Sequence, residues 1–209
     1  MEVRVACMDK KSWWLVNSYL FICVAFLMVL AMTSQTWYYT SLGSDYHGGL
    51  LRFEDQEFYK YYYGCNNYYD CTSDTLFDSK AEEPLKKLFI GGVIYILGTS
   101  VSLIALFSSV VVLGLDALGR FDSTRNAIGL VWVAWFSNTL GFTIWALLAK
   151  VTLGSESKCD GTIDEGVCLG EGGVLALVLI FITFSAALLH TLVVKRIKKL
   201  SSGPPQNHI

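Results

Sequence analysis

The sequence predicts an all-α membrane protein: a four-transmembrane-helix bundle with a small extracellular antiparallel β-sheet formed by its first loop. Three observations lead to this fold class. Of the 209 residues, 53% are hydrophobic and 16% are charged, whereas a soluble domain carries about 25% charged residues. The hydrophobic residues concentrate in four long runs, and aromatic residues crowd the connection between the first two runs. We therefore expect residues 1–209 to form a single four-span membrane domain.

Each of the four runs is long enough to cross a bilayer as a helix, which takes about 20 apolar residues. We expect spans at about residues 14–33, 88–113, 127–149 and 173–194, none of which contains Asp, Glu, Lys or Arg. Four such helices in a soluble protein of this length would leave almost no amphipathic surface for water. No A-x-A-like cleavage site follows the first run, so we interpret it as an uncleaved signal anchor.

The distribution of Lys and Arg predicts the orientation of the spans. Both tails and the short connection between the second and third spans hold nine of the 16 basic residues, although they are short. The outer loops, at about residues 34–87 and 150–172, hold the other seven and 14 of the 18 acidic residues. Because basic segments stay in the cytoplasm, we expect both termini to be cytoplasmic. We expect the protein to span the plasma membrane or a related secretory-pathway membrane.

The positions of the cysteines agree with this topology. Each outer loop holds one pair, Cys65 with Cys71 and Cys159 with Cys168, and an oxidising compartment permits disulfides there. Local pairing is the economical connectivity and cross-loop pairing is the alternative. Cys7 lies next to the first span, where it is either a free thiol or a site of reversible palmitoylation.

The first outer loop is the most informative segment, because it holds nine of the eleven tyrosines. Aromatic density of this kind favours strands, which we expect near residues 36–42, 49–54, 58–65 and 68–72. Residues 79–87 then favour a short helix that breaks at Pro84.

The aromatic rings of this loop either fill a small core above the membrane or bind a partner, since Tyr and Trp are enriched at binding hot spots. Nearby carboxylates would orient a basic partner. The candidate partner-binding residues are Trp37, Tyr61, Tyr62, Tyr63, Tyr68, Tyr69, Glu54 and Asp55.

We recognise no catalytic motif in this sequence. It lacks C-x-x-C, G-x-S-x-G, H-E-x-x-H and phosphate-binding motifs, so we expect no catalytic, metal or cofactor site. A net charge of −2 argues against nucleic-acid binding. Within the spans, we interpret His190 as a helix-end polar residue, Asn138 as an interhelical contact, and Gly98 with Ser102 as a small-x-x-x-small pair for internal packing.

The layout resembles the tetraspan superfamily of claudins, peripheral myelin protein and calcium-channel gamma subunits. The resemblance rests on four spans with both ends inside, on the exit from the first span at residues 33–37 (TSQTW), and on Cys65 and Cys71 further along the loop. Tyr62-Tyr63-Gly64 stands where that family has Gly-Leu-Trp, so the chain resembles a distant relative of the claudin superfamily.

These features favour a non-enzymatic, claudin-like membrane protein that acts by protein–protein interaction. It would serve as an auxiliary subunit of a channel, receptor or other membrane complex, or in cell–cell contact. Its partners would be the lipid bilayer and either another membrane protein or further copies of itself. The alternative is a pore-forming subunit of the innexin or connexin type, whose chains have larger cytoplasmic parts than this one.

Overall fold

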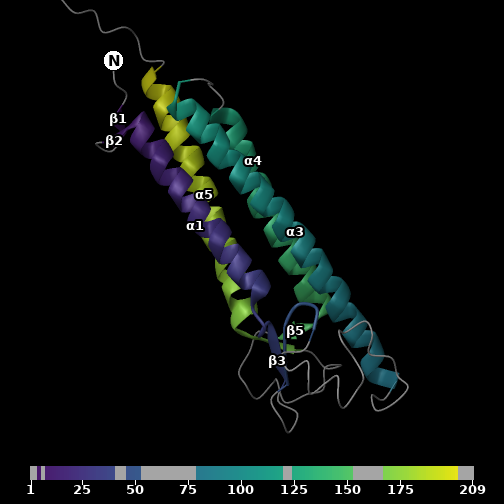
Figure 1. The fold of residues 1–209 in the computed structure, drawn as a ribbon. Coiled ribbons are helices and arrows are strands. Elements are labelled where there is room, and N and C mark those ends of the chain that lie inside the picture. Colours follow the sequence, from purple (N-terminus) through teal and green to yellow (C-terminus); the bar gives the residue numbers. More distant parts are fainter. Residues whose placement is uncertain are drawn as a thin grey trace, which may run out of the picture.

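The computed structural model describes residues 4–5, 8–40, 46–52, 79–119, 124–152 and 167–201. Within them, four helices are long and apolar enough to cross a membrane, which confirms the predicted multi-pass, four-span plan. These helices are α1 (Lys10–Thr33), α3 (Ser79–Ala117), α4 (Thr124–Leu148) and α5 (Glu171–Ser201). They run side by side along one bundle, and a small sheet lies at one end (Figure 1).

The start of α1 and the end of α5 lie together at the end of the bundle opposite the sheet (Figure 1). Two antiparallel strands of two residues each, β1 (Arg4–Val5) and β2 (Met8–Asp9), precede α1 at this end. An even number of spans returns the chain to the side on which it began.

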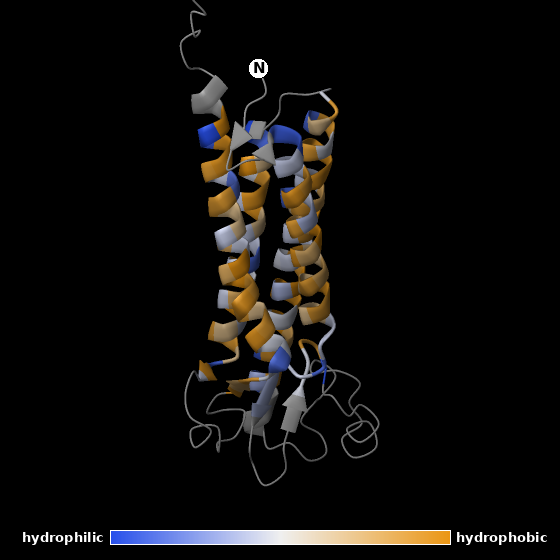
Figure 2. Cartoon of the chain, turned by 90° about the vertical axis from the view of Figure 1, so that its left-hand side faces the viewer, coloured by the Kyte–Doolittle hydropathy of each residue, from blue (hydrophilic) through white to orange (hydrophobic). Residues whose placement is uncertain are grey.

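Large apolar side chains cover the outside of the helices. Tyr19, Ile104 and Phe181 are 72%, 67% and 66% exposed, and hydrophobic colour runs along all four helices between more polar ends (Figure 2). A surface of this kind suits contact with lipid chains, because hydrocarbon accepts apolar groups that water would not.

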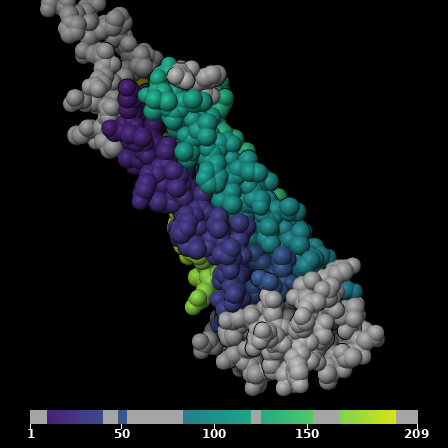
Figure 3. Space-filling model, viewed as in Figure 1, coloured from purple at the N-terminus to yellow at the C-terminus, as the bar shows by residue number. Residues whose placement is uncertain are grey.

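Helices α3 and α4 approach each other closely because small residues face each other. A Cβ atom placed on Gly98 would lie 2.7 Å from the Ser137 carbonyl oxygen and 3.3 Å from Cα of Gly141. One turn further, the Ser102 hydroxyl donates a hydrogen bond of 2.8 Å to the Ala134 carbonyl. Gly98 and Ser102 therefore serve packing between α3 and α4, as predicted. In the space-filling view, α1 also lies against α3 along the bundle (Figure 3).

The sheet differs from the prediction because the loop after the first span and the loop after the third span both contribute to it. Its strand order is β4-β3-β6-β5, where β3 (Tyr38–Thr40) and β4 (Tyr46–Gly48) belong to the first loop. The second loop supplies β5 (Val151–Thr152) and β6 (Val167–Leu169). Strands β4, β3 and β6 pair antiparallel, whereas β5 pairs parallel to β6. The sheet is thus mixed rather than purely antiparallel.

The predicted strand positions in the first loop also differ from the structure. The strand expected at 36–42 forms as β3, but residues 49–52 form a bend and the second strand is β4 at 46–48. Gly49 closes this bend, since its amide donates to the Arg52 carbonyl at 2.9 Å. The strands expected at 58–65 and 68–72 lie outside the described residues.

The helix break expected at Pro84 is also corrected, because α3 continues through this residue. Pro84 lies only a few residues into α3. Pro84 is the sixth residue of the helix, so its missing amide removes one backbone hydrogen bond from the second turn, and the helix nevertheless continues past it. Lys87 and Glu83 support this turn with an ion pair of 2.6 Å.

Candidate functional site

Trp37 anchors the sheet end to the bundle. It lies four residues after the end of α1 and is fully buried. Its indole Nε1 donates a hydrogen bond of 2.7 Å to the carbonyl of Ala31, in the last turns of α1. Its ring lies edge-on to Tyr95 of α3 and Trp145 of α4, with centroids 4.6 Å and 5.0 Å away. One side chain therefore connects the first loop to three helices.

The backbone of Trp37 connects the two loops that form the sheet. Its amide donates to the Gly48 carbonyl at 2.6 Å, and its carbonyl accepts from the Gly170 amide at 2.8 Å. A Cβ atom on Gly170 would lie 2.5 Å from the Thr36 carbonyl oxygen, and one on Gly172 would lie 2.8 Å from Cδ1 of Trp37. Glycine at these positions lets the start of α5 pack directly against the exit of α1.

These contacts change the role that we expected for Trp37. We placed it among the partner-binding residues, but a fully buried ring cannot lie on the surface that meets a partner. The structure gives Trp37 a packing role instead. A tryptophan at the end of an apolar run is equally typical of a membrane interface, so the sequence alone did not separate these roles.

The other candidate partner-binding residues, from Glu54 to Tyr69, lie outside the described residues. The described residues on either side of this segment, up to 52 and from Ser79 on, lie at the sheet end of the bundle (Figure 1).

Cys168 is the one described cysteine of the four that we expected in disulfides. It is buried on β6, opposite Tyr39 of β3, and it is disulfide-bonded. Cys23 on α1 is a free thiol, so the cysteine that pairs with Cys168 lies outside the described residues. Cys65, Cys71, Cys159 and the palmitoylation candidate Cys7 also lie there.

Asn138 lies at the centre of the bundle, as predicted for an interhelical contact. It is fully buried, and its Oδ1 accepts a hydrogen bond of 3.2 Å from the Thr99 hydroxyl of α3. Other hydroxyls bond back to their own helix, among them Ser109 to the carbonyl of Ala105. The contact between Thr99 and Asn138, in contrast, ties α3 to α4.

His190 is corrected from a helix-end residue to a buried one. Its ring is fully buried between α1 and α5, 5.7 Å from the rings of both Trp14 and Phe21. Neither of its nitrogens has a hydrogen-bond partner among the described residues. Hydropathy averages over a whole helix, so it does not say which face a single histidine occupies.

An ion pair near His190 was missed by sequence reasoning. Lys10 of α1 donates to a carboxylate oxygen of Asp116 at the end of α3, at 3.0 Å. The carboxylate is only 4% exposed, and the Lys10 ammonium lies 5.9 Å from the Trp14 ring centroid. Asp116 lies just beyond the second apolar run. An acidic residue at the end of the bundle that carries the basic residues was the signal in the sequence that could have indicated an ion pair.

The described residues contain no group of three or more His, Cys, Asp or Glu side chains that could hold a metal ion. No protein-family model matches the chain, and no curated protein matches it.

Proposed function

We propose that this chain is a non-enzymatic, claudin-like tetraspan protein that acts through protein–protein contact at its sheet end. It would serve as an auxiliary subunit of a channel, receptor or other membrane complex, or in cell–cell contact. The observation that carries the proposal is the shared sheet: both outer loops join in one sheet, and Trp37 fixes that sheet to three helices. A rigid support lowers the entropy lost when a surface binds its partner.

The proposed orientation places the sheet outside the cell. Lys10, Lys11, Lys195 and Arg196 lie at the end of the bundle opposite the sheet, and basic residues flank the cytoplasmic ends of spans. The membrane would be the plasma membrane or a related secretory membrane. An epitope inserted at residue 205 should bind antibody only after cells are permeabilised, and binding to intact cells would contradict this orientation.

The binding surface would be the aromatic segment whose flanking residues lie at the sheet end of the bundle. Its tyrosines, from Tyr61 to Tyr69, would supply affinity, and Glu54 and Asp55 would orient a basic partner surface. Disulfides Cys65–Cys71 and Cys159–Cys168 would hold the two loops in shape.

Peptide mapping without reduction tests the disulfide assignment, since a peptide joining Cys168 to Cys65 or Cys71 would contradict local pairing. Each short loop closed by a disulfide should gain about 2–3 kcal/mol of stability. Cys159→Ser should therefore lower delivery of the protein to the cell surface.

Co-purification from native membranes tests the function. A stoichiometric membrane partner should accompany the wild-type chain. Serine substitutions at Tyr61, Tyr62 and Tyr63, made one at a time, should weaken that complex by about 1–2 kcal/mol at outward positions. Tyr19→Ser is the matched control, because this tyrosine is 72% exposed on α1, away from the sheet. Equal loss of the partner in the control would contradict a sheet-end surface.

Reconstitution of the purified chain in liposomes separates this proposal from a pore. The bundle interior is filled by buried side chains such as Met28, Leu106 and Trp145, which supports a protein that carries no flux by itself. Ion or dye flux from the chain alone would overturn the proposal.

A further inference from the structure

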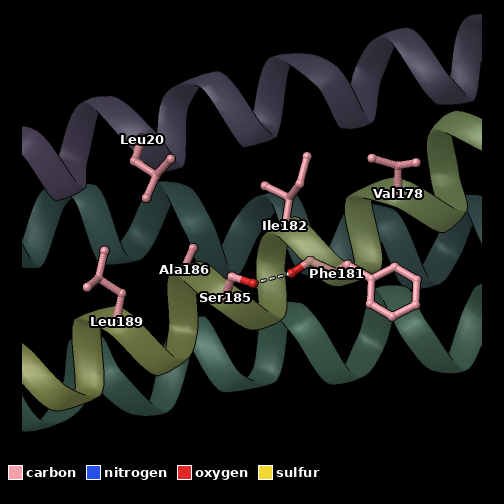
Figure 4. Close-up of a pocket in the computed structure, with 7 residues that line it drawn as sticks. All are labelled: Leu20, Val178, Phe181, Ile182, Ser185, Ala186 and Leu189. Carbon is pink, nitrogen blue, oxygen red and sulfur yellow. Dashed lines mark hydrogen bonds between the residues drawn. The ribbon is translucent and has the colours of Figure 1, made fainter.

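A groove runs along the outside of the bundle between α1 and α5. Its volume is about 390 Å³. Leu20 forms the α1 wall, and side chains of α5 form the rest (Figure 4). The lining residues are Leu20, Val178, Phe181, Ile182, Ser185, Ala186 and Leu189.

The chemistry of the groove suits a hydrocarbon chain. The one hydroxyl in its lining, that of Ser185, is already bonded to the Phe181 carbonyl at 2.8 Å (Figure 4). The lining side chains therefore offer a ligand no free donor. The volume lies near the small end of the range for ligand pockets, about 300–1,000 Å³. That space suits one extended chain better than an α-helix, which is about 10 Å across.

A charged residue lies beyond the groove, toward the end of the bundle opposite the sheet. Ile182, Leu189 and Arg196 are spaced seven residues apart on α5, which is about two helical turns, so they share one face. Arg196 is exposed and lies about 10 Å beyond Leu189 along the helix. On α1, Trp13 stands seven residues before Leu20 and shares its face in the same way, and tryptophan is enriched at the level of lipid headgroups.

We propose that this groove is a specific binding site for an anionic phospholipid. One acyl chain lies between Leu20 and the small side chains of Ser185 and Ala186, and the lipid phosphate pairs with Arg196. The charge of Arg196 complements the phosphate, and a guanidinium can hold two phosphate oxygens at once. The occupant is a lipid rather than a partner helix, because the apolar groove leads toward the cationic side chain of Arg196 at the depth of the lipid headgroups.

Photo-crosslinking in vesicles tests this site with the full chain. The probe is phosphatidylserine with a diazirine on one acyl chain, at one lipid in ten in phosphatidylcholine vesicles; the same chain on phosphatidylcholine is the comparison. Phosphatidylserine should label Leu20, Phe181, Ser185 and Leu189 several-fold more than the comparison lipid does. Residues on other lipid-exposed faces, such as Ile104 of α3, should show no such preference.

Two substitutions separate the charge from the groove. Arg196→Gln should lower the phosphatidylserine preference about fivefold, as expected for one basic residue near an anionic headgroup. Lys195→Gln is the matched control, because Lys195 is turned about 100° from Arg196 around α5 and its loss should change little. Ala186→Phe should fill the groove and lower labelling by both lipids.

The outcomes distinguish a site from general lipid contact. Equal labelling of the groove and of the Ile104 face by both lipids would overturn the proposal. Equal effects of Arg196→Gln and Lys195→Gln would also overturn it, because they would indicate a diffuse basic surface. The site goes beyond the proposed function, so its failure would leave partner binding at the sheet end unaffected.

Discussion

Replacing Gly92 with alanine should detach the first loop from α3. Gly92 lies under the bend that follows β4, where the Leu50 backbone crosses the helix. A Cβ atom at this position would lie 2.1 Å from the Leu50 carbonyl oxygen and 2.9 Å from its carbon. Ordinary contact begins at 3.4 Å, so the Leu50 backbone would have to retreat by about 1 Å.

The expected loss follows from two opposing effects. Overpacking of a well-packed site costs about 1–3 kcal/mol, and the upper part of this range applies because the atom that must move is backbone. Leu50 is only 4% exposed, so its movement also weakens buried contacts. Alanine favours a helix over glycine by about 1 kcal/mol. We therefore expect a net loss of about 2 kcal/mol.

The free energy of unfolding in mixed micelles, titrated with a denaturing detergent, gives this number directly. Hydrogen exchange of the amides at 46–52 reports on the loop itself and should speed up. Gly114→Ala is the matched control, because a Cβ atom there would meet nothing within 4 Å. It should leave stability unchanged or raise it by up to about 1 kcal/mol.

A Gly92→Ala protein as stable as the Gly114→Ala protein would refute the close approach of Leu50 to α3. Lower stability with unchanged exchange at 46–52 would place the strain elsewhere in the bundle.

Three further predictions concern side-chain contacts, each measured as the free energy of unfolding in the same micelles. Trp37→Phe keeps most ring packing but deletes the indole hydrogen bond, so it should cost about 1–2 kcal/mol, and wild-type stability would argue against that bond. The pair Thr99→Val and Asn138→Leu should show a coupling of about 0.6–1 kcal/mol in a double-mutant cycle, and additive effects would contradict their contact. The side chain of Lys10 is 40% exposed and that of Asp116 is 4% exposed, so the coupling energy of this ion pair should be only about 1 kcal/mol. The stability lost in Lys10→Met should be restored by adding Asp116→Asn, because the second change removes the unpaired buried carboxylate. A double variant no more stable than Lys10→Met would count against the ion pair.

The four helices were predictable because hydropathy is a property of long segments. The expected spans begin and end within the observed helices apart from a residue or so at the end of α4, although α3 begins earlier, at Ser79. Internal packing at Gly98 was predictable for a similar reason, since small residues three or four positions apart allow helices to approach.

The sheet was predicted only in part, because its pairing is non-local. Strands β5 and β6 have two and three residues, which is too short for an alternating pattern to be recognised. The pairing of Tyr39 with Cys168 joins residues far apart in the chain, and no local signal encodes it. The same limit applies to His190 and Asp116, whose burial depends on which helix lies beside them.

The position of β6 between its partners sets an order of assembly during synthesis. Strand β3 is made just after the first span, yet its neighbour β6 emerges only after the third. The sheet therefore cannot close until nearly the whole chain has been translated and the last span can insert. A nascent or truncated chain would present an unpaired β3 edge, which is open to pairing with another chain. Completion of the sheet would then mark a fully inserted molecule.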